Sequence, residues 1–437
     1  MRRVDLGERA VFWVCVGLVL AFSQCWVMLL TGPLDPPVPA ALSAALRNFF
    51  FPVYAAVLGL ALMRPRGSVR AMLRSPALML LLAVAVASIT WSIDREVTAR
   101  RCIAVLFTTF AALVLAERFA WPRFLEVFAT AFGITVVLSF FLALFVPEYG
   151  VMQSDFPGAW RGAWSHKNTL GFYMSVSLIV FIASAIANPR RRWLWLLGAA
   201  AALLLILLSQ SKTSLASCMI GLACMPLMAA ARRGPAWAIA ATYLAVSVLA
   251  GLAIGFYMFP DYVLGLLGKD ATLTGRTDIW AAVLRQIAHR PLTGYGYGAV
   301  WDNTSAWGPL PWISKEQGFV IHEAHNTMLG LWLDIGLVGL GAWLLLFLSV
   351  WVRAIRELYR PGSGFFAVPF LAVFSLHTLT ESVALVQNDL IWLIFAATAV
   401  KLSVGERIAP ASARSTEFRQ ATGQRPVRPG PWRGLRP

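Results

Sequence analysis

The sequence predicts an all-α membrane protein whose helices cross the bilayer many times. Of its 437 residues, 59% are hydrophobic and only 13% are charged, and the mean hydropathy is +0.69. A single soluble core could not bury that much apolar side chain. Apolar stretches of about 20 residues, the length of a helix that crosses a bilayer, recur along the chain. They lack the alternating pattern of barrel strands, so a helical bundle is expected.

Twelve apolar stretches are expected to form spans, which makes residues 1–404 one transmembrane bundle. Their approximate limits are 10–30, 44–63, 76–93, 102–118, 124–146, 168–188, 193–209, 211–230, 235–259, 327–352, 364–383 and 385–402. Between the ninth and the tenth stretch, residues 260–326 form the one large hydrophilic loop. Residues 405–437 are rich in Pro and Arg and poor in apolar side chains, which predicts a disordered basic tail.

The basic residues predict the orientation of the bundle. Most of the 37 lysines and arginines lie in every second loop or in the tail, as in the groups 64–74, 190–192 and 353–360. Because loops rich in Lys and Arg stay in the cytoplasm, both termini are expected there. The 260–326 loop would then lie on the periplasmic face of a bacterial inner membrane. The net charge of +16 therefore reports topology, and nucleic-acid binding is not expected.

Three short motifs mark the hydrophilic loop as the place for chemistry. They are GRTDIW from Gly275, PLTGYGYG from Pro291 and HEAHN from His322. In a chain with so few charged residues, one long polar insertion is where recognition of a water-soluble group can occur. Residues 260–326 are therefore expected to be a catalytic loop.

Two local structures are expected inside this loop. Ile279, Val283 and Ile287 recur on one helical face, which predicts a short amphipathic helix at the membrane surface. Tyr295 and Tyr297 alternate with glycines, which predicts a tight turn whose backbone can approach a ligand. Both tyrosines are therefore secondary candidates for the site.

Lys and Arg are normally concentrated in the cytoplasmic loops of membrane proteins. Basic side chains on the outward side are therefore candidates for binding an anion. They are Arg100 or Arg101, Arg161, Lys167, Lys212, Arg276, and Arg47 at the outer end of its span. Guanidinium groups bind phosphate oxygens in pairs, and several together suit a diphosphate. Lys212 is the sharpest case, because an ammonium between two apolar runs is costly without a counter-charge. The alternative for each residue is contact with lipid headgroups or snorkelling from a helix end.

His325 is the leading candidate for a catalytic base, because it heads the tenth span next to the hydrophilic loop. An imidazole titrates near neutrality and can deprotonate or orient a hydroxyl, although an interfacial histidine can equally be structural. His322, His166 and Asn326 are secondary candidates. A zinc site built from His322, Glu323 and His325 is not favoured, since the spacing is not HExxH. Neither a metal nor another cofactor is expected.

The motifs together resemble a known family. Taken in order, RGAWSHKNTLG, SQSKTSL, GRTDIW, PLTGYGYG and HNTMLGLWLDIGLVGL resemble the motifs of the O-antigen ligase/polymerase superfamily, and WSIDREVTARR matches a further pattern. The form with HKN and SKT is most similar to polymerases of the exopolysaccharide-production type. The resemblance covers most of Trp91 to Leu402. It implies a C-type glycosyltransferase-like bundle that uses an undecaprenyl-diphosphate-linked oligosaccharide without a metal.

Residue by residue, the resemblance implies that Arg276 and Lys212 bind the donor diphosphate and that His325 acts near the acceptor hydroxyl. Many members carry Arg where Lys212 stands, and lysine keeps the charge but loses the bidentate fork. The expected activity is a metal-independent, inverting glycosyl transfer that polymerises exopolysaccharide repeat units at the periplasmic face. The bilayer, the glycan acceptor, and polysaccharide export and chain-length proteins are the expected partners.

Two other functions remain open from the sequence. The same chemistry could ligate glycan to lipid A core or to a protein hydroxyl, because the loops that select the acceptor cannot be interpreted from one sequence. A transporter of a lipid-linked glycan or an anionic solute would carry ionisable residues along a path through the membrane. Here the intramembrane candidates are only Asp334, His377 and Glu381, whereas polar groups gather outside, which favours catalysis at the surface.

Overall fold

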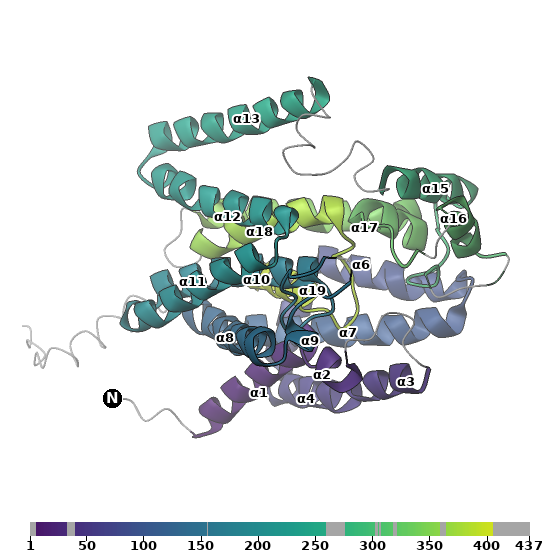
Figure 1. Cartoon of the computed structure of the whole chain (residues 1–437), viewed down its shortest axis with the longest axis horizontal. Helices are drawn as coiled ribbons and strands as arrows, with labels where there is room; N and C mark the ends of the chain where they lie inside the picture. Colours follow the sequence, from purple (N-terminus) through teal and green to yellow (C-terminus); the bar gives the residue numbers. More distant parts are fainter. Residues whose placement is uncertain are drawn as a thin grey trace, which may run out of the picture. The chain divides into compact units, whose positions relative to one another are not determined.

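The computed structural model describes residues 6–32, 40–154, 156–258, 276–301, 305, 307–317, 321–358 and 364–404 (Figure 1). Within these ranges the regular structure is helical, and an isolated β-bridge joins Val151 to Trp160. The all-α class predicted from the sequence is therefore confirmed for the described part of the chain. The tail 405–437 and residues 260–275 of the hydrophilic loop lie outside it.

Each of the twelve apolar stretches overlaps at least one helix. The α-helices are α1 (Leu6–Ser23), α2 (Val27–Thr31), α3 (Ala40–Asn48), α4 (Phe50–Met63), α5 (Pro65–Leu73), α6 (Pro76–Ala87), α7 (Arg95–Arg118), α8 (Trp121–Phe145), α9 (Pro147–Gly150), α10 (Lys167–Ala187), α11 (Arg192–Leu208), α12 (Lys212–Ala231), α13 (Pro235–Met258), α15 (Arg276–His289), α16 (Pro309–Gln317), α17 (Thr327–Glu357), α18 (Gly364–Thr380) and α19 (Leu390–Val404). Two 3-10 turns, η1 (Ser88–Thr90) and η2 (Pro189–Arg191), connect neighbouring helices.

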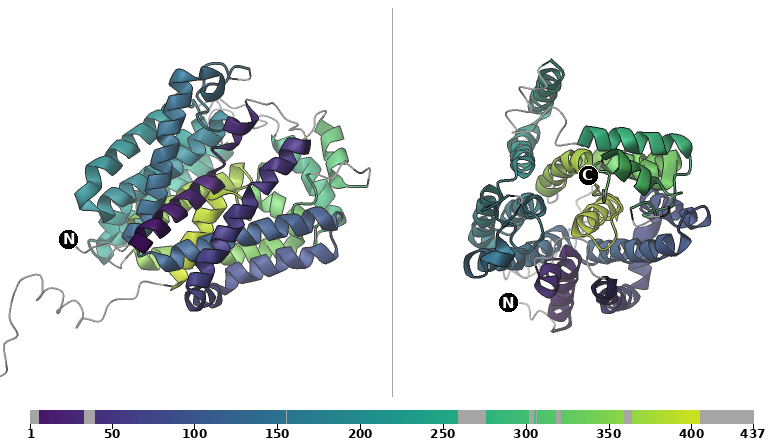
Figure 2. Two further views of the ribbon diagram at one scale, coloured as in Figure 1. Left: turned by 90° about the horizontal axis from the view of Figure 1, so that it is seen from below. Right: turned by 45° about the vertical axis from the view of Figure 1, so that its right-hand side comes forward.

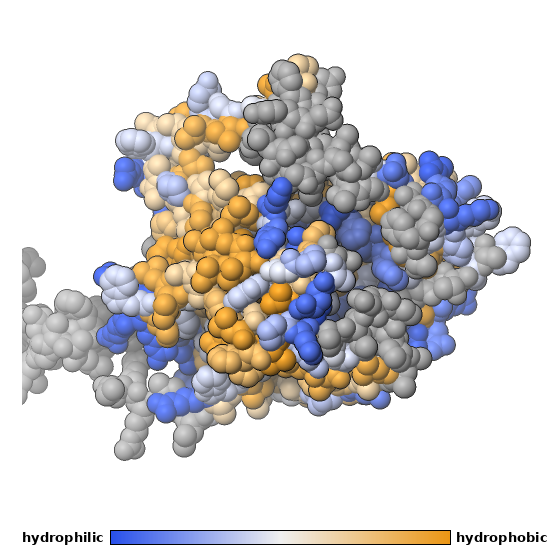
Figure 3. All heavy atoms as spheres, viewed as in Figure 1, coloured by the Kyte–Doolittle hydropathy of each residue, from blue (hydrophilic) through white to orange (hydrophobic). Residues whose placement is uncertain are grey.

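Seven helical segments of the described chain are long and apolar enough to cross a membrane, or eight if the bent pair Pro65–Leu73 and Pro76–Thr90 is one span. The seven are Ala44–Met63, Arg95–Arg118, Trp121–Phe145, Lys167–Ala187, Pro189–Leu208, Lys212–Ala231 and Thr327–Glu357. Pro235–Val248, Phe365–Thr380 and Leu390–Val404 are apolar but shorter. The chain is thus a multi-pass membrane protein, and twelve spans remain a prediction. Apolar side chains cover much of the face in Figure 3, and hydrophilic ones gather near α15 and α16.

Helices α10 and α19 form the centre of the bundle (Figure 2). Helix α10 packs against α8, α11, α12 and α18, and α19 packs against α7 and α17. Every residue of α19 from Leu390 to Leu402 is buried. A helix that is apolar on all sides belongs inside a bundle, where each face meets another helix. These two central helices carry the N-terminal ends that later line the candidate site.

The described part of the hydrophilic loop folds into two helices, α15 and α16. Ile279, Val283 and Ile287 lie on one face of α15, as their spacing predicts. This face is buried in an apolar cluster that includes Ile313 of α16 and Leu333 of α17. The short amphipathic helix is therefore confirmed, and its place at the membrane surface stays a prediction. Its apolar face packs on the protein because α16 and α17 present apolar side chains to it.

Helix α17 contains a break that divides it into two segments. Ile335 has φ −124° and Gly336 has φ +69°, so neither residue is helical. The left-handed conformation suits glycine, and a Cβ added to Gly336 would lie 2.1 Å from the carbonyl oxygen of Leu292. After the break, the N–H of Leu337 donates to the carbonyl of Pro291 at 2.9 Å. The break is thus built around the PLTGYGYG segment.

The same segment satisfies the carbonyl groups that the break leaves without a helical partner. The N–H of Tyr295 donates to the carbonyl of Leu333 at 3.0 Å, and the N–H of Gly296 donates to that of Asp334 at 2.8 Å. The Asp334 carboxylate accepts from the N–H of Gly298 at 3.0 Å. Unpaired backbone groups are expensive inside a membrane protein. The glycine-rich turn therefore packs against this broken helix, and its approach to a ligand stays a prediction.

Candidate active site

A polar cavity of about 450 Å³ lies where the N-terminal ends of α10, α12, α15, α17 and α19 meet the C-terminal end of α18. Its polar lining comprises His166, Asn168, Thr169, Tyr173, Ser211, Thr213, Ser214, Arg276, Glu323, His325, His377, Glu381, Ser382 and Asp389. Helix N-termini carry partial positive charge and unpaired backbone N–H groups. A cavity built from several of them is therefore suited to an anion.

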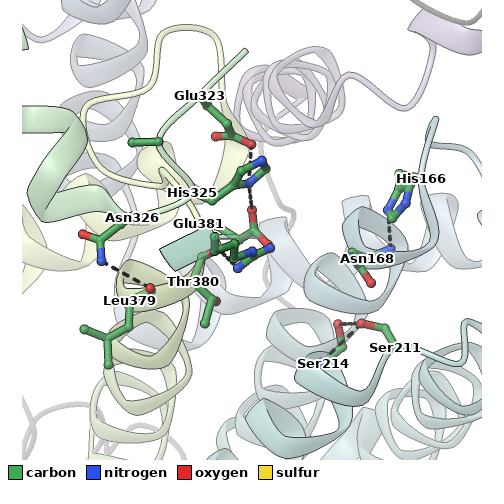
Figure 4. Close-up of polar contacts among 12 residues, drawn as sticks. His166, Asn168, Ser211, Ser214, Glu323, His325, Asn326, Leu379, Thr380 and Glu381 are labelled. Carbon is green, nitrogen blue, oxygen red and sulfur yellow. Dashed lines mark hydrogen bonds and ion pairs between the residues drawn. The ribbon is translucent and has the colours of Figure 1, made fainter. Parts of the chain in front are cut away.

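Arg276 and His325 meet through one carboxylate, that of Glu381. Figure 4 shows His325 between Glu381 and Glu323. The Nη2 of Arg276 lies 2.9 Å from Oε1 of Glu381, and its Nη1 donates to the carbonyl of Thr380. The Nδ1 of His325 lies 3.1 Å from the other carboxylate oxygen, Oε2. The arginine uses only part of its five N–H donors on these contacts, so others remain for a ligand.

His325 is held between two carboxylates in a backbone conformation that is unusual for its residue type. Its Nδ1 also lies 3.2 Å from Oε1 of Glu323, and its φ is +49°. Residues other than glycine rarely adopt positive φ, and such backbone often occurs at functional sites. The left-handed turn places the imidazole at the cavity, immediately before the start of α17.

The charges of this cluster change the proton affinity of its members. Burial alone would lower the pKa of His325, but the hydrogen bond with Glu381 and the negative charge of Glu323 outweigh burial and raise it. Burial raises the pKa of Glu323, mainly because the charged carboxylate loses solvent. Burial also acts to raise the pKa of Glu381, but His325 and Arg276 stabilise its charged form and lower the pKa overall.

Long-range contacts fix Glu381 beside His325. The hydroxyl of Thr327, in the first turn of α17, donates to the backbone carbonyl of Glu381 at 2.8 Å and accepts from the N–H of Val383 at 3.0 Å. The indole of Trp280 in α15 donates to the carbonyl of Ala324 at 3.0 Å. Helices α15, α17 and α18 are therefore tied together at the cavity, and so are the side chains they carry.

A second polar group faces this cluster from the starts of α10 and α12 (Figure 4). His166 caps α10, with its Nδ1 accepting from the N–H of Asn168 at 3.1 Å. Ser211 caps α12, and its hydroxyl lies 2.9 Å from that of Ser214. Side-chain caps of this kind satisfy one N–H group and leave others directed at the cavity.

Two lysines stand in the first turns of the same helices. Lys167 places its Nζ 3.7 Å from the centre of the Phe156 ring, a cation–π contact. Lys212 is exposed and does not line the cavity, but its charge is close enough to interact with that of Lys167. Both ammonium groups therefore lie beside the helix ends that border the cavity.

Two predicted arginines lie outside the cavity and make local contacts. Arg100 pairs with Glu96 at 3.3 Å on the exposed side of α7. Arg161 donates to the carbonyls of Tyr149 at 2.9 Å and Glu148 at 2.6 Å, and so fastens the loop before α10.

The remaining secondary candidates also lie outside the cavity lining. Tyr295 and Tyr297 are buried, and their hydroxyls donate to the carbonyls of Gln286 and Leu385 respectively. His322 is exposed. Asn326 is the N-cap of α17, where its side chain accepts from the N–H groups of Met328 and Leu329. Their described contacts are structural.

Three side chains of the metal-ligand type come together, and they differ by one residue from the set His322, Glu323 and His325. Candidate ligand atoms of Glu323, His325 and Glu381 all lie within 4.8 Å of one another. Glu381 takes the place of the exposed His322. The guanidinium of Arg276, 2.9 Å from Glu381, already supplies positive charge and would repel a divalent cation. The donor set therefore fits an arginine-bridged acid–base cluster better than a metal site.

Sequence reasoning missed the central position of Glu381 and the hydroxyl and amide groups of Asn168, Ser211 and Ser214. Glu381 ends an apolar run, which predicts only an ionisable residue near the end of a span. A usable signal was present in the capping pattern, because Ser211 directly precedes an apolar helix. The pairing of Glu381 with His325, in contrast, depends on tertiary contact.

Comparisons with known proteins show what parts of this chain are similar to. Residues 197–344 match the family model described as O-antigen ligase, and this range contains Arg276 and His325. The exopolysaccharide production protein ExoQ of Rhizobium meliloti strain 1021 is 31% identical over 220 residues, which are 48% of this chain and 49% of that protein. An O-antigen ligase of Pseudomonas aeruginosa strain PAO1 is 29% identical over 99 residues, 23% of this chain and 21% of the relative.

The chain thus spans about half the length of the first of these relatives and less of the second. The predicted resemblance is confirmed by both matches and by the family model. Residues 197–344 of this multi-pass helical membrane protein are thus similar to the O-antigen ligase family.

Proposed function

We propose that the chain is a glycosyltransferase that moves a glycan from undecaprenyl diphosphate to the hydroxyl of an acceptor sugar. Its product would be an exopolysaccharide, polymerised at the periplasmic face of a bacterial inner membrane. The observation that carries the proposal is the joint placement of Arg276 and His325 on Glu381 inside a cavity bordered by helix N-termini. The longer match, to an exopolysaccharide production protein, favours polymerisation.

The donor diphosphate would bind between Arg276 and the starts of α10 and α12. Arg276 offers N–H groups not used by Glu381 and Thr380, and guanidinium groups bind phosphate oxygens well. The helix N-termini add partial positive charge, and Lys167 and Lys212 add full charges nearby. Arg100 and Arg161 do not line the cavity, so the proposal gives them no contact with the diphosphate.

His325 would accept the proton of the acceptor hydroxyl while that oxygen attacks the anomeric carbon. A new carbon–oxygen bond forms there, and the bond to the diphosphate breaks with its electron pair leaving on the phosphate oxygen. The positive groups around the diphosphate stabilise the charge that develops on it. Attack from the face opposite the leaving group inverts the anomeric carbon. Because arginine, lysines and helix ends supply the positive charge, the transfer is proposed to need no metal.

The orientation of the bundle is a separate hypothesis, motivated by basic residues concentrated in alternate loops. A reporter enzyme that is active only in the periplasm should be active when fused after Trp307, in the lobe of α15 and α16. The same reporter fused after Arg233, between α12 and α13, should be silent. The reverse pattern would place the cavity on the cytoplasmic side and end the proposal of a periplasmic site.

Deleting the gene should separate polymerisation from ligation. If the enzyme polymerises, the cells should lose high-molecular-weight exopolysaccharide and accumulate single repeat units on the carrier lipid. If it ligates, long polymers should accumulate on the lipid instead. Mass analysis of extracted carrier lipids measures both, and a plasmid copy of the wild-type gene is the control. Normal lipid intermediates together with normal polymer would contradict both forms of the proposal.

A further inference from the structure

His377 lines the same cavity but has no role in the mechanism above. It belongs to α18, one helical turn before Glu381, whose N–H donates to the His377 carbonyl at 2.8 Å. Its side chain is only 2% exposed, and its ring stacks on that of Phe172 with the centres 3.6 Å apart. The imidazole is therefore held rigidly at the cavity wall.

The hydrogen bonds of Ser217 fix which nitrogen of His377 carries the proton. The Ser217 hydroxyl donates its single proton to the carbonyl of Thr213 at 2.9 Å. Its oxygen also lies 2.9 Å from Nε2 of His377, and with its proton already used it can only accept there. Nε2 therefore bears the hydrogen in the neutral ring, and Nδ1 presents a lone pair.

This Nδ1 is buried and has no hydrogen-bond partner among the described residues. A buried acceptor without a partner is costly, and such groups in native proteins call for an explanation. Around the cavity, Arg276 already pairs with Glu381, and the hydroxyl of Tyr173 donates to Asp389 at 3.0 Å. A ligand that supplies a neutral donor would satisfy the Nδ1 of His377.

We propose that His377 binds substrate, with its Nδ1 accepting a hydrogen bond from a sugar hydroxyl held in the cavity. A phosphate oxygen is an acceptor and would face the Nδ1 lone pair unfavourably, so the diphosphate is not its ligand. Sugar hydroxyls are the neutral donors that a glycan substrate brings. The proposal rests on the proposed function, and the hydroxyl can belong to the donor glycan or to the acceptor.

Two substitutions of His377 test its two ring nitrogens separately. In His377→Asn the amide lies near the place of Nδ1 and can still accept from a hydroxyl. In His377→Gln the amide reaches the place of Nε2 and keeps the contact with Ser217. Losing one hydrogen bond to a neutral group should weaken glycan binding about three- to tenfold in His377→Gln. His377→Asn should remain near wild type.

The assay uses full-length protein in nanodiscs, with two probes taken from the deletion strain. One is the accumulated lipid-linked oligosaccharide, and the other is the same oligosaccharide released from its lipid. Dissociation constants for both probes show whether the hydroxyl belongs to the donor glycan or to the acceptor. Ser217→Ala removes the partner of Nε2 and leaves Nδ1 in place. It should therefore lower the melting temperature of the protein, while the dissociation constants of both probes stay near the wild-type values.

Equal affinity of the Asn and Gln variants, or weaker binding by Asn than by Gln, would overturn the role of Nδ1. Affinity loss in Ser217→Ala as large as in His377→Gln would also overturn it, because the ring would then act only through packing. Failure of the proposed function is seen separately, as absence of transfer by the wild-type protein in the same nanodiscs.

Discussion

Changing Arg276 to alanine should reduce glycan transfer roughly 100- to 1000-fold, the cost of removing one preorganised group that stabilises developing charge. The guanidinium is only 17% exposed and stands 2.9 Å from Glu381, so no solvent cation replaces it fully. Alanine would also leave the Glu381 carboxylate without its positive partner. The measurement is turnover of extracted lipid-linked oligosaccharide by purified protein, at equal abundance of folded enzyme.

Two variants make this result specific to the guanidinium. Arg276→Lys should recover only part of the activity, because a single ammonium cannot contact the diphosphate and Glu381 as a fork does. Arg285→Ala is the matched control, since Arg285 lies on the same helix but pairs with Glu316 outside the cavity. It should stay within about twofold of wild type, as exposed ion pairs contribute little. Wild-type turnover by a normally abundant Arg276→Ala protein would exclude Arg276 from the site.

The sequence alone could select Arg276 and His325, because a charge or an imidazole beside a long apolar run must serve some purpose. It could not select Glu381 as their common partner. That pairing joins residues 105 and 56 positions apart in the chain. It depends on Thr327 fastening the start of α17 to the segment after α18. Contacts of this kind follow from tertiary packing and leave no local pattern.

For the PLTGYGYG segment, the sequence predicts the local structure but not the tertiary contact. Alternating glycines correctly predicted a tight turn, since Gly294, Gly296 and Gly298 all have positive φ. The sequence does not show that the turn packs against a break in α17. The apolar run of this helix continues through Ile335 and Gly336 without a change in the spacing of its apolar residues. Hydropathy therefore predicts the span but not its break, and the contact of the turn with the broken helix leaves no local pattern.

Changing His325 to alanine should lower transfer by roughly 10²- to 10⁴-fold, the contribution of a positioned general base. The variant should still bind the lipid-linked donor, because its diphosphate contacts belong to Arg276 and the helix N-termini. His322→Ala is the control, since that histidine is exposed and does not line the cavity. Transfer by a folded His325→Ala protein at the wild-type rate would exclude the proposed base.

The pH dependence of the transfer rate also tests His325 as a base, because a purely structural histidine would not produce the expected dependence. His325 must be neutral to accept a proton, so the rate should rise as pH increases through its pKa. The carboxylates of Glu381 and Glu323 raise the pKa of His325, which moves this limb above the ordinary value of 6.5. Glu381→Gln removes one negative charge, so the limb should move to lower pH. An unmoved limb in this variant would assign the titration to another group.

Metal dependence is decided in the same assay, because Glu323, His325 and Glu381 could also present ligand atoms to an ion. Activity should survive excess EDTA, since Arg276, the lysines and the helix ends supply the positive charge at the diphosphate. If EDTA stops transfer and an added divalent ion restores it, the three residues act as ligands. His325→Ala would then lose metal affinity together with activity, whereas loss of a base leaves metal binding unchanged.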